Sequence, residues 1–86
     1  MTYRVLYLAK VKNDIIPAIP RKNREQILTA ICERLAVDPA GVGKPLQYTL
    51  KGYWRLRVGK WRVVYKITDD CVVIYDIVIR RDAYGD

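Results

Sequence analysis

The strongest constraint on the fold lies in residues 54–65, which read W-R-L-R-V-G-K-W-R-V-V-Y. On both sides of Gly59-Lys60, large apolar side chains alternate with arginines, as in strands that bury one face. A Gly-X pair suits a two-residue turn, because glycine takes the required positive φ at little cost. This segment therefore predicts a tight β-hairpin.

A two-residue turn fixes which residues face each other across the hairpin, and therefore which side chains share a face. One face is apolar and is expected to pack on the core: Trp54, Leu56, Val58, Trp61, Val63 and Tyr65. The other face is strongly basic and carries Tyr53, Arg55, Arg57, Arg62, Val64 and Lys66.

On the basic face this register places Arg57 directly opposite Arg62. Like charges across a strand pair are destabilising, and stability alone would favour a carboxylate there. We interpret the arginines as a site for an anion. The alternative is an ordinary solvated basic face, or arginines paired with Asp69, Asp70 or Asp76.

The remaining sequence predicts helices followed by strands. The expected elements are a strand at 2–8, a short helix at 10–18, a helix at 20–36, a loop at 38–52, and strands at 53–58, 61–68 and 72–79. This β-α-α-β-β-β order predicts one α+β domain over residues 1–86, with a two-helix hairpin on one face of a small, mostly antiparallel four-stranded sheet. If the two helices form an up-down hairpin, the first strand can pair antiparallel with either the strand at 53–58 or the strand at 72–79.

The register of the last strand depends on the preceding loop. A two-residue loop, Asp69-Asp70, would turn Asp76 towards the helices, where a charge is costly. A three-residue loop from Asp69 to Cys71 moves Asp76 and Arg80 to the arginine side. We expect the three-residue loop.

The charge balance suggests a polyanionic partner. Sixteen Lys and Arg face nine Asp and Glu, which gives a net charge of +7. Nucleic acid, an acidic protein or an anionic membrane surface would all fit. The chain has no histidine, the commonest general base and metal ligand, so we expect neither a metal site nor a cofactor. It shows no signal-peptide pattern and no apolar run of membrane-spanning length, which predicts a cytoplasmic protein without a membrane partner.

Three segments, residues 13–35, 43–67 and 72–84, together resemble the RelE/ParE toxin superfamily of type II toxin–antitoxin modules. The most specific parts are the hairpin G-x-W-R-L-R-V-G-x-W-R-V-V-Y and the closing R-R-D-x-Y. The resemblance implies a RelE-like fold and a cognate, acidic, RelB-like antitoxin. For the RelE-like branch it also implies an mRNA interferase, which cleaves translated mRNA on the ribosome and arrests growth. The ParE-like branch instead inhibits DNA gyrase, and a degenerate toxin would only bind its antitoxin.

The resemblance also implies roles for individual residues. Arg62 matches the arginine that contacts the scissile phosphate, and Arg55 matches a basic strand position. Arg81, or Arg80, matches an arginine near the end of the last strand, and Tyr84 matches the tail tyrosine. We expect these further residues to bind RNA: Lys51, Arg57, Lys60, Lys66 and Arg80.

Two departures from the family pattern bear on the chemistry. Tyr53 and Ile79 replace a lysine and a histidine found in some relatives. Metal-independent RNA cleavage needs a base for the 2′-OH, and arginine is a poor proton carrier. The candidate bases are Tyr84, Lys66 and Lys60, and each would require a depressed pKa to act as a base. We therefore expect mainly electrostatic catalysis that depends on the ribosome.

Overall fold

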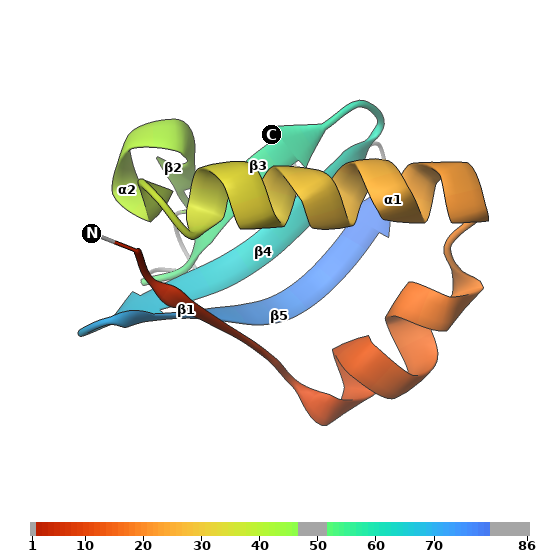
Figure 1. Ribbon diagram of the computed structural model, residues 1–86, viewed down its shortest axis with the longest axis horizontal. Coiled ribbons are helices and arrows are strands. Elements are labelled where there is room, and N and C mark those ends of the chain that lie inside the picture. The colour runs from red at the N-terminus through yellow and green to blue at the C-terminus, as the bar shows by residue number, and fades with distance from the viewer. Residues whose placement is uncertain (1, 47–51, 80–86) are drawn as a thin grey trace.

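The computed structural model describes residues 2–46 and 52–79 and has the expected α+β class (Figure 1). Its sheet has five strands rather than four, in the order β1-β5-β4-β3-β2. The strands are Arg4–Tyr7 (β1), Lys44–Pro45 (β2), Trp54–Val58 (β3), Trp61–Thr68 (β4) and Cys71–Ile79 (β5). The helical segments are Val11–Ile15 (η1), Ile16–Ala18 (η2), Arg21–Ala30 (α1), Ile31–Leu35 (η3) and Pro39–Val42 (α2).

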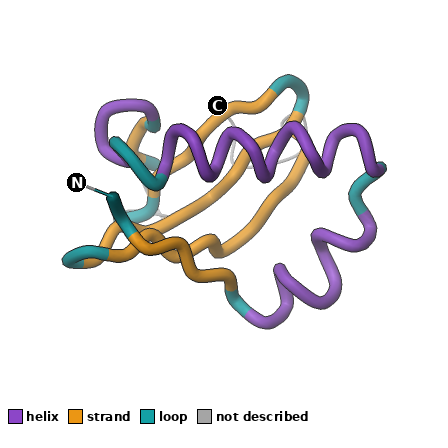
Figure 2. Tube along the Cα trace, in the orientation of Figure 1, coloured by secondary structure: helices purple, strands orange, loops and turns teal. Residues whose placement is uncertain are grey.

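Helix α1 and the π-helical segment η3 form one continuous run that confirms the helix expected at 20–36. Pro20 precedes the first helical residue, where its fixed φ costs nothing. Figure 2 shows this run crossing the strands, with the shorter η1–η2 segment set off to one side. Within the described ranges, no helix is long and apolar enough to cross a membrane.

The core lies between the α1–η3 run and one face of the sheet. The helical run contributes the buried side chains of Ile27, Ile31 and Leu35. The sheet contributes Leu56, Val58, Val63, Tyr65, Val72, Ile74 and Ile77. Trp54 and Trp61 pack against this cluster, so the expected apolar face of the hairpin is confirmed.

Strand β1 pairs parallel with β5, from Arg4 opposite Cys71 to Tyr7 opposite Ile74, so the expected antiparallel pairing is wrong. The reason is helix length. Residues 11–18 rise only about 12 Å, whereas residues 21–35 rise about 22 Å and return the chain along the sheet. With only one such return helix, β3 and β5 run in the same direction as β1. The two helical segments therefore do not form an up-down hairpin.

The β3–β4 hairpin has the expected register. The paired residues include Trp54 with Tyr65, Arg57 with Arg62 and Val58 with Trp61. Gly59 begins the two-residue turn with a φ of 60°, which a side chain would strain.

Strand β5 reaches the expected face by an unexpected route. Thr68 pairs with Cys71, so the loop is the two-residue Asp69-Asp70 turn and the three-residue loop is wrong. A β-bulge lies further along, where Val64 pairs with Asp76 but the next residue, Tyr65, pairs with Ile74. The bulge inserts Tyr75 and moves Asp76 to the face of Val64. The expected side for Asp76 is therefore confirmed, whereas Arg80 lies outside the described residues.

Within the segment predicted as a loop at 38–52, the described residues form two short elements. The Asp38 side chain caps α2, since its Oδ1 accepts a 3.2 Å hydrogen bond from the Gly41 backbone N–H. The buried Tyr65 hydroxyl donates a 2.6 Å hydrogen bond to the Pro39 carbonyl oxygen. Strand β2 then pairs with the start of β3. The hydrogen bond from Tyr65 thus connects α2 to the sheet.

Candidate nucleic-acid interface on the sheet

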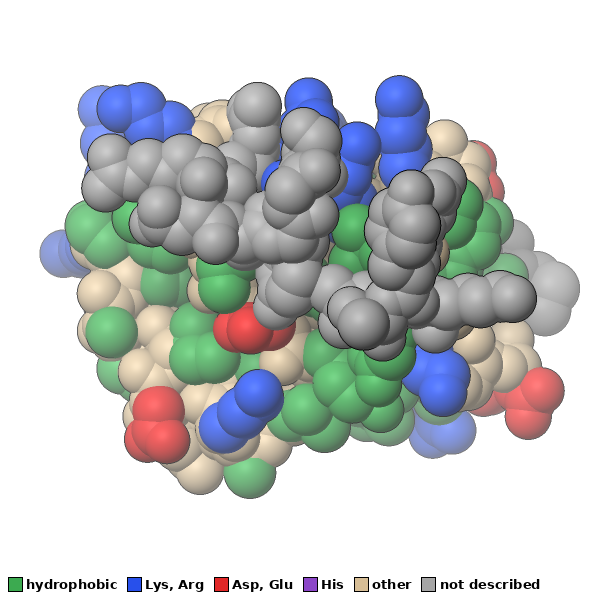
Figure 3. Space-filling model, turned by 180° about the vertical axis from the view of Figure 1, so that it is seen from behind, with side chains coloured by type: hydrophobic (Ala, Val, Ile, Leu, Met, Phe, Trp, Pro, Cys, Tyr) green, Lys and Arg blue, Asp and Glu red, His purple; other side chains and the backbone are tan. Residues whose placement is uncertain are grey.

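The sheet face opposite α1 carries the hairpin arginines, and we call it the arginine face. Its paired residues on β3, β4 and β5 are Arg55, Arg57, Arg62, Val64, Lys66, Val73, Asp76 and Val78. Figure 3 views the molecule from this side, where lysine and arginine side chains project along the upper border. The expected juxtaposition of Arg55, Arg57 and Arg62 is confirmed by the ladder.

The middle of the arginine face is covered. Arg62 is fully buried, with 0% of its surface exposed, and Val64 is 2% exposed. Around them, Arg57 and Lys66 are exposed and Arg55 is half-buried. A uniformly solvated basic face is therefore wrong, because alternation along a strand sets the face of a side chain but not its coverage.

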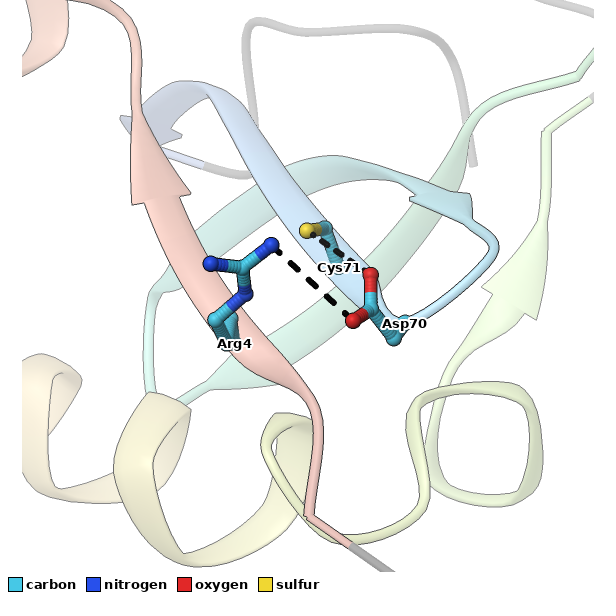
Figure 4. Close-up of polar contacts among 3 residues, drawn as sticks. All are labelled: Arg4, Asp70 and Cys71. Atoms are coloured by element: carbon cyan, nitrogen blue, oxygen red, sulfur yellow. Dashed lines mark hydrogen bonds and ion pairs between the residues drawn. The ribbon is translucent and has the colours of Figure 1, made fainter.

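The acidic residues considered as partners lie in different places. The Arg4 Nη2 atom is 3.9 Å from Asp70 Oδ2, and the Cys71 thiol donates a 3.3 Å hydrogen bond to Asp70 Oδ1 (Figure 4). Asp70 thus belongs to the β4–β5 turn beside β1. Asp76 lies on the arginine face itself, and its Oδ1 accepts a 2.9 Å hydrogen bond from the Ile77 N–H.

An aromatic pair lies on this face beside the arginines. The rings of Tyr53 and Tyr75 meet edge to face, with centroids 4.7 Å apart and planes at 90°. The ammonium of Lys66 lies 5.7 Å from the Tyr53 ring centroid. A side-chain hydrogen bond to Tyr75, with smaller contributions from desolvation and electrostatics, raises the pKa of Tyr53. The Tyr53 hydroxyl therefore stays protonated at neutral pH.

Sequence reasoning missed this tyrosine pair. Simple alternation after the Asp69-Asp70 turn would place Tyr75 opposite Val64, and only the bulge shows how it shares the face with Asp76. The sequence places Tyr53 on the basic face, but gives it no role beyond a departure from a lysine of some relatives. No turn residue or charge pattern in the sequence marks the bulge.

A groove runs between α1 and the turn end of the hairpin. Its volume is about 460 Å³. Its lining residues are Lys22, Glu25, Gln26, Thr29, Ala30, Glu33, Arg34, Arg57, Val58 and Gly59. Charges of both signs line this groove, whereas the arginine face is predominantly basic, so the two surfaces suit different ligands.

The expected site residues divide into two sets. Arg55, Arg57, Arg62 and Lys66 share the arginine face, and Lys60 is exposed in the adjoining turn. The other expected residues lie outside the described part of the chain: Lys51, Arg80, Arg81 and Tyr84. Guanidinium groups bind phosphate oxygens in bidentate fashion and aromatic rings stack on bases, so the first set suits a nucleic-acid strand.

Known proteins are similar to this chain over nearly its whole length. A family model described as the ParE toxin of the type II toxin–antitoxin system parDE matches residues 5–84. Toxin RelG of Mycobacterium tuberculosis is 34% identical over 90 residues, covering 98% of this chain and 98% of its own length.

Solved structures of toxin–antitoxin complexes share the fold. The RelBE2 complex of Mycobacterium tuberculosis superposes with a TM-score of 0.85 at 28% identity, covering 95% of this chain and 95% of the other. The archaeal RelE–RelB complex of Pyrococcus horikoshii gives a TM-score of 0.73 at 23% identity, covering 96% and 100% of the two chains. At 23% identity, the similarity to the archaeal complex concerns the fold alone.

Proposed function

The chain belongs to the ParE toxin family of type II toxin–antitoxin systems, and on that premise we propose that it is a ribosome-dependent endonuclease of translated mRNA. The observation that carries the proposal is the set of three arginines, Arg55, Arg57 and Arg62, on one rigid hairpin. Three guanidinium groups on adjacent strands suit the phosphates of a single RNA strand.

In the proposed reaction, the RNA 2′-oxygen attacks the neighbouring phosphorus while the bond from phosphorus to the 5′-oxygen breaks. A base takes the 2′ proton, and an acid protonates the leaving 5′-oxygen. Negative charge grows on the non-bridging oxygens between these events. Arg55 and Arg62 would stabilise that charge, because donors held on a rigid strand need little reorganisation.

The burial of Arg62 limits when its side chain can contact the reacting phosphate. A side chain with no exposed surface cannot touch a phosphate until its covering moves. We place that rearrangement at binding to the ribosome, which would make the isolated protein a poor nuclease on free RNA. Exposed Arg57, Lys60 and Lys66 would then guide the strand without any rearrangement.

The remaining roles are assigned by the family resemblance. Arg81 would share the contact with the reacting phosphate, and Tyr84, Lys66 or Lys60 would carry the protons. Lys51 and Arg80 would add phosphate contacts. Tyr53 is a poor candidate for the base, because the hydrogen bond to Tyr75 raises its pKa.

Neutralisation by an antitoxin is the second part of the proposal. The net charge of +7 favours an acidic partner, because complementary charges speed association. Related toxins have been solved as RelBE2 and RelE–RelB complexes. We propose a cognate, RelB-like antitoxin for this chain, which would bind it tightly and restore growth when the two are produced together.

Two observations favour inhibition of DNA gyrase as the second candidate. The family model that matches the chain is that of ParE, and a buried Arg62 is not poised for catalysis. A gyrase inhibitor would act by protein contact and would need no general base.

Inducing the protein in growing cells separates the candidates. The nuclease predicts growth arrest with new 5′ ends inside translated messages, and rescue by the antitoxin. Growth arrest without such ends, together with loss of supercoiling by purified gyrase, would replace it with the second candidate. Unimpaired growth despite high expression would contradict both.

A further inference from the structure

We propose that Tyr53 and Tyr75, with Lys66, form a stacking site for one unpaired RNA base beside the arginine face. The inference deepens the proposed function and rests on it, since it names how the same surface would hold its RNA. It draws on the ring geometry, the bulge in β5 and the position of the lysine.

The site lies on the sheet, since Tyr75 and Lys66 belong to β5 and β4 and Tyr53 directly precedes β3. The bulge adds Tyr75 to β5 between Ile74 and Asp76, and its ring reaches across β4 to Tyr53. The Tyr53 carbonyl oxygen accepts a 2.8 Å hydrogen bond from the Leu46 N–H, which ties its backbone to the neighbouring segment. Bulges often redirect a side chain next to a functional site.

The chemistry of the three side chains suits a nucleotide. Every base has a π-face, so stacking on a tyrosine ring is favourable for any sequence. Because its hydroxyl keeps its proton, Tyr53 carries no negative charge that would repel a phosphate. The exposed Lys66 ammonium lies over the Tyr53 ring, 5.7 Å from its centroid, so a base that stacks on that ring face would displace the ammonium towards the phosphate of the same nucleotide.

The position of the pair relative to the arginines also fits a strand. Tyr53 and Arg55 are two residues apart in extended chain, so their Cα atoms are about 7 Å apart and their side chains share a face. A base stacked on the tyrosines would therefore leave the adjacent phosphate near Arg55. In contrast, a purely structural tyrosine pair would need no lysine or arginine at its side.

The test measures binding of a fluorescein-labelled, unstructured oligoribonucleotide of about ten bases to the full-length protein at low salt. Tyr53→Leu and Tyr75→Leu should each weaken binding by about five- to 150-fold, the effect of losing one stacked base. Tyr53→Phe should stay within about twofold, because it keeps the ring. Tyr3→Leu is the matched control, since Tyr3 is half-buried but packs on the core cluster.

A second arm uses the wild-type protein, so it does not depend on the variants folding. A series of oligoribonucleotides is used, each with one abasic nucleotide at a different position. The inference predicts one position at which the abasic site weakens binding, and no further loss at that position in Tyr53→Leu. Equal sensitivity at all positions, unchanged binding by the leucine variants, or no binding by the wild type would each overturn it.

Cleavage of mRNA on programmed ribosomes, measured with the same proteins, keeps the two proposals apart. If the wild type cleaves and the leucine variants bind and cleave normally, the stacking site is wrong and the proposed nuclease stands. If the wild type binds through the tyrosines but cleaves nothing, the nuclease is wrong and the stacking site stands.

Discussion

Arg57 and Arg62 lie directly opposite each other in the β3–β4 ladder, yet Arg57 is exposed and Arg62 is fully buried. The repulsion expected between the two cations is therefore combined with the cost of taking one of them out of water. Both side chains belong to the arginine face, the surface that would bind RNA in the proposed function.

Stability should respond differently to the two arginines. Arg57→Ala should change the free energy of unfolding by at most about 0.5 kcal/mol, because the side chain is exposed. Arg62→Ala should lower it by about 1–3 kcal/mol, because a buried side chain leaves a cavity. Arg62→Met should recover most of the loss by keeping the volume. Denaturant melts measure all three, and a more stable Arg62→Ala would contradict the burial.

Gly43 should be irreplaceable beside Tyr65. A Cβ on Gly43 would overlap the Tyr65 hydroxyl oxygen, which donates to the Pro39 carbonyl. Gly43→Ala should therefore lower the free energy of unfolding by about 1–3 kcal/mol, through overpacking and a displaced hydrogen bond.

Tyr65→Phe provides the control for this contact. It should cost about 1 kcal/mol for the hydrogen bond alone. The double variant with Gly43→Ala should lose less than the two single losses added together, because the clashing hydroxyl is gone. Strict additivity in chemical melts would mean that Gly43 and Tyr65 do not touch.

The same tyrosine predicts how stability depends on alkaline pH. Burial, with a smaller contribution from Asp38, raises the pKa of Tyr65 above its ordinary value of 10.0. The contribution of Tyr65 to the free energy of unfolding is thus complete below about pH 10. It is lost as the pH rises, because the unfolded chain releases the hydroxyl proton first. Between about pH 8 and about pH 11, melts should show a smaller decrease in the free energy of unfolding for Tyr65→Phe than for the wild type. Equal losses would contradict the raised pKa.

Salt dependence should separate the exposed arginine from the buried one. Arg57→Ala should reduce the slope of log affinity for single-stranded RNA against log salt by about 0.7, the value for one phosphate. Arg62→Met should leave the slope of the isolated protein unchanged, because a buried cation makes no phosphate contact. Lys12→Ala, an exposed change on η1, is the control. A slope near zero for the wild type would exclude a phosphate-led interface.

The hairpin could be predicted from the sequence because its information is local. Alternation and the Gly59-Lys60 turn fix the pairing, and the structure confirms it. The direction of β1 could not be obtained this way, since it depends on how far residues 11–18 carry the chain. The short elements between Pro39 and Pro45 depend on a tertiary contact with Tyr65 and leave no periodic pattern.

The candidate site was predictable in part for the same reason. The shared face of Arg55, Arg57 and Arg62 follows from strand geometry, whereas the burial of Arg62 depends on what packs over it. The three-residue loop that we expected would turn Tyr75 towards the helices, and the bulge that brings both Tyr75 and Asp76 to the arginine face departs from simple alternation.

The central claim is that the hairpin arginines stabilise the transition state of mRNA cleavage. Its most direct test is single-turnover cleavage on programmed ribosomes by the wild type, by Arg62→Met and by the control Lys12→Ala. Arg62→Met keeps the buried volume, so melts can establish that it is folded. The account predicts cleavage by the wild type and the control, and a rate about 10²–10³-fold lower for Arg62→Met. A folded Arg62→Met protein that cleaves at the wild-type rate, or a wild type that does not cleave, would contradict it.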